Sequence, residues 1–376
     1  MIHTLTHAGR WARLRAPLLA LAVLAGACDS SDNLATTDPT VPADGVSLDS
    51  AAADSPAADP AGTDSLATDS SPSDVLAAAD LADIEASEAA IRGKGVPYGP
   101  YGLWRDYTTL RPYRAPFTTS LNYSDARGIL KQIAAARKHN QSLILAMTGG
   151  GHEPYKTRGK FDMAKWKRRM DSFNRNEIKA AVAQGVRDGT IIMNNIMDEP
   201  NVKSWGGVMT KARLDEMARY VKRIFPTLPV GVAVIHTWRP QERYRAVDAI
   251  ITQYSWYMGN VTTWKNEAVK QARVNGTSVA FALNILNGGE QSWKTKACPI
   301  GKTGGKGTMG KNSPACRMTA TQVREWSKAL GPAGCAMIMW RYDDAFMSKA
   351  ANKSAFQAAA AALTKAQGRS CRRGSV

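Results

Sequence analysis

The sequence has no uninterrupted apolar run of the roughly 18 residues that a membrane-spanning helix needs. Aromatic residues make up only 7% of its 376 residues, although 44% are hydrophobic. A polytopic membrane protein is therefore excluded. The length is sufficient for one large domain or two ordinary ones.

Charge of one sign is missing from each of the first two parts of the chain. Residues 1–28 contain three arginines and no acid, whereas residues 29–91 contain 14 Asp and Glu and no Lys or Arg. Residues 92–376 then carry 46 Lys and Arg against 18 Asp and Glu, a net charge of +28. The charge thus divides the chain into a short basic leader, an acidic segment and a strongly cationic main part.

The basic leader has the pattern of an export signal. Three arginines precede a short apolar stretch over Ala16–Ala27, and Ala25-Gly26-Ala27-Cys28 follows. Small residues before a cleavage point are typical of such signals. The segment resembles the bacterial lipoprotein lipobox, with Ala25 where Leu is commoner. The resemblance implies a signal peptide over residues 1–27, cleavage before Cys28 and a lipid on its thiol; the alternative is an ordinary secretory signal. Either reading predicts an exported protein, and the first a membrane-anchored lipoprotein of the bacterial cell envelope.

Residues 28–91 lack the side chains that build a core. They consist almost wholly of Ala, Asp, Ser, Thr and Pro, without any Trp, Tyr, Phe, Lys or Arg. Such a segment cannot bury enough apolar surface to offset the entropy lost on ordering. The sequence predicts a disordered tether over residues 28–91, followed by one domain over residues 92–376.

Cysteine is scarce, and four of the five cysteines lie beyond Cys28. An even number in an exported chain favours disulfides. We expect Cys298 to pair with Cys316 across a Gly- and Lys-rich loop, and Cys335 with Cys371. A zinc site is the alternative, but neither a CxxC motif nor a neighbouring His supports it.

Eight apolar, β-rich runs alternate with stretches of helical periodicity from about residue 97 onward. Near-continuous apolar strands followed by helices are typical of a parallel sheet covered by helices. The expected strands are Tyr101–Arg105, Thr118–Asn122, Ser142–Met147, Thr190–Met197, Pro229–Ile235, Ala249–Trp256, Ser278–Leu286 and Cys335–Tyr342.

The expected helices fit the same arrangement. Asp125–Lys138 and Thr210–Phe225 each place apolar residues on one face. Eight β/α units in this length predict a single (β/α)8 barrel. A doubly wound sheet is the alternative, and the first unit has no room for a proper helix between Asp106 and Phe117.

Polar and aromatic residues gather where these strands end. Catalytic and binding groups of a (β/α)8 barrel lie at the carboxyl ends of its strands. The expected ligand contacts are Arg105, Asp106, Asp198, Asn201, Trp238, Tyr254, Trp256, Asn284 and Trp340.

Asp198-Glu199-Pro200-Asn201 closes the fourth expected strand and resembles the Asn-Glu-Pro motif of clan A glycoside hydrolases. Trp340 at the end of the eighth strand and Tyr254 at the end of the sixth are similar to residues of the same clan. The resemblance covers residues 97–365 as architecture and implies that Glu199 is the general acid/base. Asp198 stands where the clan has Asn. The seventh strand ends in Asn284 and Asn287 instead of the nucleophile Glu.

A second carboxylate is needed because glycoside cleavage normally uses two, on either side of the scissile bond. Glu290, Asp343 and Asp344 are the candidates. We expect Asp343 to be the partner of Glu199, because the last strand neighbours the first in a closed barrel. The alternative role of Asp343 and Asp344 is to cap the last helix.

The charge of residues 92–376 suits an acidic polysaccharide, a nucleic acid or an anionic surface. The sequence contains no nucleic-acid-binding or nucleotide-binding motif, so we expect a polysaccharide as the ligand. We expect the protein to be a monomer that uses no cofactor and no metal ion. A glycoside hydrolase is the first hypothesis. A non-catalytic glycan-binding lipoprotein with a degenerate barrel site is the second. A metal-dependent hydrolase that uses Asp198, Glu199, Asp343 and Asp344 as oxygen ligands is the third.

Overall fold

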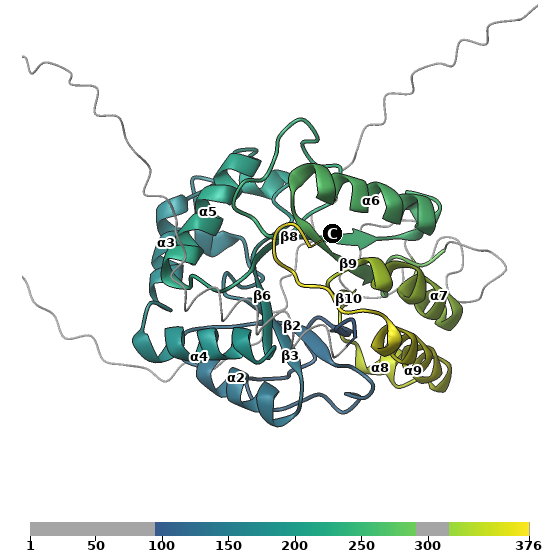
Figure 1. Ribbon diagram of the computed structural model, residues 1–376. Helices are drawn as coiled ribbons and strands as arrows, with labels where there is room; N and C mark the ends of the chain where they lie inside the picture. Colours follow the sequence, from purple (N-terminus) through teal and green to yellow (C-terminus); the bar gives the residue numbers. More distant parts are fainter. Residues whose placement is uncertain (1–94, 291–315, 376) are drawn as a thin grey trace, which may run out of the picture.

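The computed structural model describes residues 95–290 and 316–375. The signal peptide, the tether, Cys28 and Cys298 lie outside these residues, so the predictions about them stay predictions. Within the described part, helices surround a central set of strands (Figure 1).

Eight parallel strands form one sheet with the order β1-β10-β9-β8-β7-β6-β3-β2. Their bounds are β1 Tyr98–Pro100, β2 Thr119–Tyr123, β3 Ser142–Ala146, β6 Ile191–Asp198, β7 Val230–Ala233, β8 Ala249–Tyr254, β9 Ser278–Asn284 and β10 Met337–Trp340. A parallel bridge between Tyr101 and Leu121 joins the two ends of this order. The sheet is thereby nearly closed, which confirms the predicted (β/α)8 barrel.

Helices follow six of the eight strands. Their bounds are α2 Ile129–Lys138, α3 Met163–Asp171, α4 Asn176–Arg187, α5 Lys211–Ile224, α6 Val261–Asn275, α7 Ala320–Leu330, α8 Asp344–Met347 and α9 Ala350–Lys365. Short 3₁₀ turns are η1 Glu153–Tyr155, η2 Lys203–Trp205, η3 Trp256–Met258 and η4 Gly331–Ala333, and a small hairpin pairs β4 Lys156–Thr157 with β5 Lys160–Phe161.

Two connections between strands have no helix, and only the second of them departs from the prediction. The segment between β1 and β2 has no helix, as its length suggested, and neither has the segment between β7 and β8. In the second connection Tyr244 and Val247 are buried and occupy part of the layer that a helix would fill. The barrel flank is therefore thinner beside α5.

The first strand begins three residues earlier than predicted. β1 covers Tyr98–Pro100, not Tyr101–Arg105. A Cβ atom on Gly99 would lie 1.8 Å from the carbonyl oxygen of Thr119, so only glycine allows β1 to approach β2 this closely. Tyr101 consequently occupies the carboxyl end of the first strand.

Two apolar clusters account for the core. The first lies between the strands and the helices and includes Leu143, Leu145 and Met147 of the β3 region. The second contains only residues on or beside strands, such as Ile144 and Ala146, together with Cys371 from the C-terminal tail. Because successive strand residues point to opposite faces, the second cluster fills the barrel interior.

The C-terminal tail is fastened across the barrel at the amino ends of the strands (Figure 1). The predicted disulfide between Cys335 and Cys371 is present, with Cα atoms 5.2 Å apart. Arg372 donates to the carbonyl oxygen of Thr227 at 2.7 Å, and Arg373 donates to that of Val247 at 2.6 Å. Cys316 is also disulfide-bonded, but its expected partner Cys298 lies outside the described residues.

None of the helices described here has the length and apolar character that would let it cross a membrane.

Candidate active site

Glu199 lies immediately after β6, the fourth strand of the barrel. Its backbone has a φ of 43°, a left-handed conformation that residues other than glycine adopt rarely. Its N–H donates to the carbonyl oxygen of Ala233 at the end of β7 over 2.9 Å. Unusual backbone conformations of this kind cluster at functional sites, so the conformation of Glu199 agrees with a functional role.

Asp198 and Glu199 form a pair of neighbouring carboxyl groups, and the pKa of each is raised. Both side chains are half-buried. Burial raises the pKa of Glu199, and burial together with the charge of Glu199 raises the pKa of Asp198 to about 7. A raised pKa brings a carboxyl group closer to neutral pH, which favours its use as a general acid.

The raised pKa of Asp198 predicts a pH-dependent stability. Protonated Asp198 is favoured in the folded state, so its contribution to stability is complete below the ordinary value of 3.8 and is lost as the pH rises to about 7. Asp198→Asn stays neutral throughout. We expect the melting temperature of this variant to rise relative to the unsubstituted protein between pH 4 and pH 7. If the difference in melting temperature between the two proteins stays constant over this pH range, the raised pKa of Asp198 is contradicted.

Tyr101 and Trp340 bring two aromatic rings to the same end of the barrel. Their ring centroids are 4.8 Å apart, and the rings are tilted by 35°. Burial raises the pKa of Tyr101, and the nearby charge of Asp198 raises it further. Tyr101 was missed by the sequence prediction because the first strand was placed too late, whereas Trp340 was predicted.

Glycine residues after β3 lie against the tyrosines of the first two strands. A Cβ on Gly149, whose φ is 83°, would lie 2.4 Å from the ring of Tyr123, and one on Gly150 would lie 3.4 Å from the hydroxyl of Tyr101. The absence of side chains here leaves room for both rings beside the carboxylates.

A second aromatic group supports the β6 end from the following loop. The indole N–H of Trp205 donates to the carbonyl oxygen of Asp198 at 3.4 Å. The ring of Trp205 lies 4.0 Å from that of His152, whose Nδ1 is 2.9 Å from the hydroxyl of Ser204. This packing fixes the backbone that carries the carboxylate pair.

The end of the seventh strand, β9, carries an amide instead of a carboxylate. Asn284 pairs in register with Trp340, and its Oδ1 accepts the N–H of Asn287 at 2.9 Å. Glu290 is exposed, and its Oε2 is 3.4 Å from the amide nitrogen of Gln322. Asn284 thus lies in register with Trp340 on the neighbouring strand, at the strand end where the resemblance implied a nucleophilic Glu.

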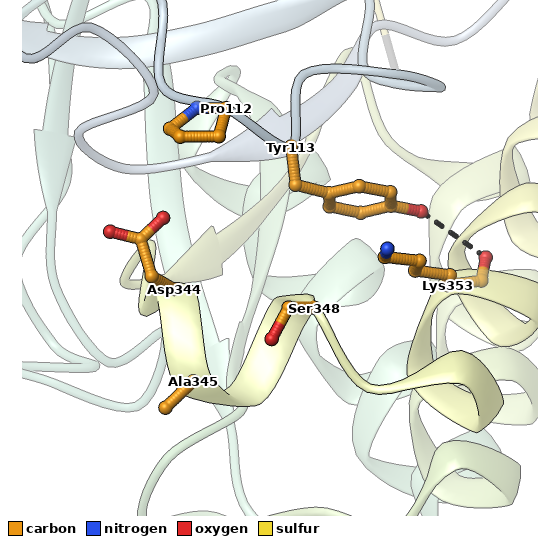
Figure 2. Close-up of a pocket in the computed structure, with 6 residues that line it drawn as sticks. All are labelled: Pro112, Tyr113, Asp344, Ala345, Ser348 and Lys353. Carbon is orange, nitrogen blue, oxygen red and sulfur yellow. Dashed lines mark hydrogen bonds between the residues drawn. The ribbon is translucent and has the colours of Figure 1, made fainter.

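Asp343 caps a helix. Its Oδ1 accepts the N–H of Phe346 at 2.7 Å, which makes it the N-cap of α8. Asp344 is exposed and lies 3.7 Å from Arg111. Asp344 also lines a surface pocket of about 450 Å³ with Tyr113 and Lys353, in which the tyrosine hydroxyl donates to the carbonyl oxygen of Lys353 (Figure 2).

The other predicted contacts lie in varied surroundings. Arg105 is exposed, and Asp106 accepts the N–H groups of Thr108 and Thr109 in a local turn beyond the end of β1. Within residues 95–290 and 316–375, neither forms a hydrogen bond or an ion pair with Asp198 or Glu199. Asn201 is exposed and Trp238 is half-buried.

Tyr254 and Trp256 follow β8. Tyr254 is only 2% exposed, packs against Trp264 and Trp326, and donates its hydroxyl to the carbonyl oxygen of Gly259. Its ring therefore belongs to the core. Trp256 is half-buried, and its indole N–H has no partner among the described residues.

In the part of the chain that the structure describes, no three His, Cys, Asp or Glu side chains converge as they would around a metal ion.

No protein-family model and no curated protein matches this chain. Solved structures do match in fold. A double mutant of the Cellulomonas fimi endo-beta-1,4-mannanase is 15% identical, with a TM-score of 0.46 over 73% of this chain and 74% of the other. Native xylanase 10B from Thermotoga maritima is 9% identical, with a TM-score of 0.44 over 73% and 98%. The glycoside hydrolase family 10 xylanase from Thermobacillus composti is 9% identical, with a TM-score of 0.41 over 67% and 86%.

These structural neighbours are a mannanase and two xylanases. At such identities the similarity concerns the fold alone. The strand order and the near closure of the sheet define the described part of the chain as a (β/α)8 barrel with a carboxylate pair at the end of its fourth strand.

Proposed function

We propose that the domain hydrolyses glycosidic bonds of a polysaccharide and that Glu199 is its general acid/base. The observation that carries the proposal is the half-buried Glu199, whose pKa is raised, at the carboxyl end of the fourth barrel strand. A protonated carboxyl at this place can donate its proton to the glycosidic oxygen as the bond breaks. If the second carboxylate meanwhile bonds to the anomeric carbon, the ionised Glu199 can then take a proton from the water that breaks this new bond.

Aromatic rings at the same end of the barrel as Glu199 support a sugar as the ligand. Tyr101 and Trp340 are half-buried rings in mutual contact. Aromatic faces bind apolar patches and leave polar edges for hydrogen bonds, which suits a sugar ring. Asn284 beside Trp340 offers an amide for hydroxyl groups.

The proposal is tested by a screen for hydrolysis. The mature protein is incubated with mannan, xylan and polygalacturonate, and new reducing ends are measured. Release from at least one polysaccharide is the expected result. If none is cleaved but one is bound, the second hypothesis of a non-catalytic glycan-binding protein replaces hydrolysis. That hypothesis is favoured by Asn284, which stands where a nucleophilic carboxylate is expected.

Asp343 is the proposed second carboxylate, and its capping role allows a clean test. Asn caps helices about as well as Asp. Asp343→Asn is therefore expected to leave the melting temperature unchanged while lowering kcat by about 10²-fold or more if the charge acts in catalysis. Unchanged hydrolysis in a normally folded variant would limit Asp343 to capping α8.

The proposal of export and membrane anchoring rests on the N-terminal sequence alone. We propose that Cys28 carries a lipid that holds the protein at the bacterial cell envelope. In cells that produce Cys28→Ala, we expect the protein to move from the membrane fraction to the soluble exported fraction, since a lipid supplies the membrane affinity. Identical fractionation of both forms would contradict the anchor.

A further inference from the structure

The barrel flank beside α5 contains a pocket that the proposed hydrolysis does not use. The connection between β7 and β8 has no helix, and a hollow of about 580 Å³ lies between this connection and α5. Its lining consists of Thr210, Ala212, Asp215, Arg219, Glu242, Arg243 and Arg245.

The pocket wall is held by buried hydrogen bonds. Asp215 is 2% exposed, and its carboxylate accepts the N–H groups of Arg245, Ala246 and Val247 at 2.7 to 3.0 Å. Lys211 is also buried, and its Nζ donates to the carbonyl oxygen of Glu242 at 2.7 Å. The connection is therefore fixed against α5, and the pocket is a built feature.

The two carboxylates of the pocket already have partners. Asp215 is saturated by backbone N–H groups, and Glu242 pairs with Arg239 at 2.5 Å and accepts the N–H of Lys211 at 2.9 Å. Arg219, Arg243 and Arg245 are exposed. Within residues 95–290 and 316–375, their guanidinium groups have neither a hydrogen bond nor an ion pair. The charges of Lys211 and Arg239 offset those of Asp215 and Glu242, so the three guanidinium groups form an excess of positive charge at one pocket.

We propose that this pocket binds the acidic groups of an anionic polysaccharide. A guanidinium group presents parallel N–H donors that match the two oxygens of a carboxylate. The lining contains no large apolar side chain to enter a lipid layer, which favours a glycan over a membrane surface. The excess positive charge of the domain agrees with an acidic ligand. The proposal does not depend on hydrolysis, because the pocket lies on the barrel flank.

The test compares two variants that lose the same charge. Arg219→Gln, Arg243→Gln and Arg245→Gln are combined in one protein. Arg127→Gln, Lys131→Gln and Lys138→Gln, which alter exposed residues on and before α2, are combined in the control. Both are made in the mature chain with Cys28→Ala, so that a lipid does not confuse the result. Affinity for polygalacturonate is measured at one fixed salt concentration, with neutral dextran as the uncharged ligand.

The pocket variant should bind polygalacturonate at least about tenfold more weakly, since hydrogen bonds between charged groups are lost. The control should change by less than about threefold, and dextran should show no charge-dependent binding. Equal losses in both variants would overturn the proposal, because they would show only general attraction by a basic protein. Absence of polygalacturonate binding by the unsubstituted pocket would overturn it as well.

Discussion

Glu199→Gln should lower the rate of glycan hydrolysis by about 10² to 10⁴-fold, because an amide cannot transfer the proton that the leaving oxygen needs. The loss should appear in kcat, since the amide has nearly the shape of the carboxyl and preserves ligand binding. The measurement is steady-state hydrolysis of whichever polysaccharide the screen identifies.

Glu216→Gln is the matched control for this variant. Glu216 lies on the exposed side of α5, where it pairs with Lys167 at 2.8 Å. An exposed ion pair contributes little to stability, so this change should leave both hydrolysis and folding unaltered. Full activity in Glu199→Gln, or equal losses in the two variants, would remove Glu199 from the chemistry.

Removal of the Cys335–Cys371 disulfide should have the largest effect on stability. The bond spans a sequence separation of 36 residues. Closing a loop of that length is worth about 4 kcal/mol by chain entropy. The tail that it holds also places Cys371 in the barrel interior. In the same tail, Arg373 donates to the carbonyl oxygen of Val247 in the connection between β7 and β8.

Cys335→Ala combined with Cys371→Ala avoids burying new hydroxyl groups. We expect its melting temperature to fall by roughly 10 °C, since a domain of this size shifts by about 2 to 4 °C for each kcal/mol. Thermal unfolding without reductant measures the shift. A fall of less than about 2 °C would mean that the tail stays in place through its hydrogen bonds alone.

The barrel could be predicted because its signal lies in long apolar runs. β3, β6, β8 and β9 are buried along nearly their whole length, and apolar residues predominate in each of them. β1 was misplaced because it is only three residues long and ends in Pro100. Its identity depends on Gly99, whose close approach to Thr119 is a tertiary contact that periodicity does not register.

The candidate site was predicted as far as strand ends determine it. Asp198, Glu199, Asn284 and Trp340 follow long or well-marked strands and lie at their carboxyl ends. Arg105 and Asp106 were placed at the site because β1 was placed too late. Tyr254 was included for its strand end, but its ring points into the core, since alternate residues of a strand face opposite sides.

The central claim is that Glu199 donates a proton to a leaving glycosidic oxygen. The most direct test is how the loss of kcat/KM in Glu199→Gln depends on the leaving group of the substrate. The measurement compares a dinitrophenyl glycoside, whose leaving group needs no proton, with the methyl glycoside of the same sugar. The account predicts a large loss of kcat/KM on the methyl glycoside and a small one on the dinitrophenyl glycoside. Equal losses on both substrates would contradict a role for Glu199 as the general acid.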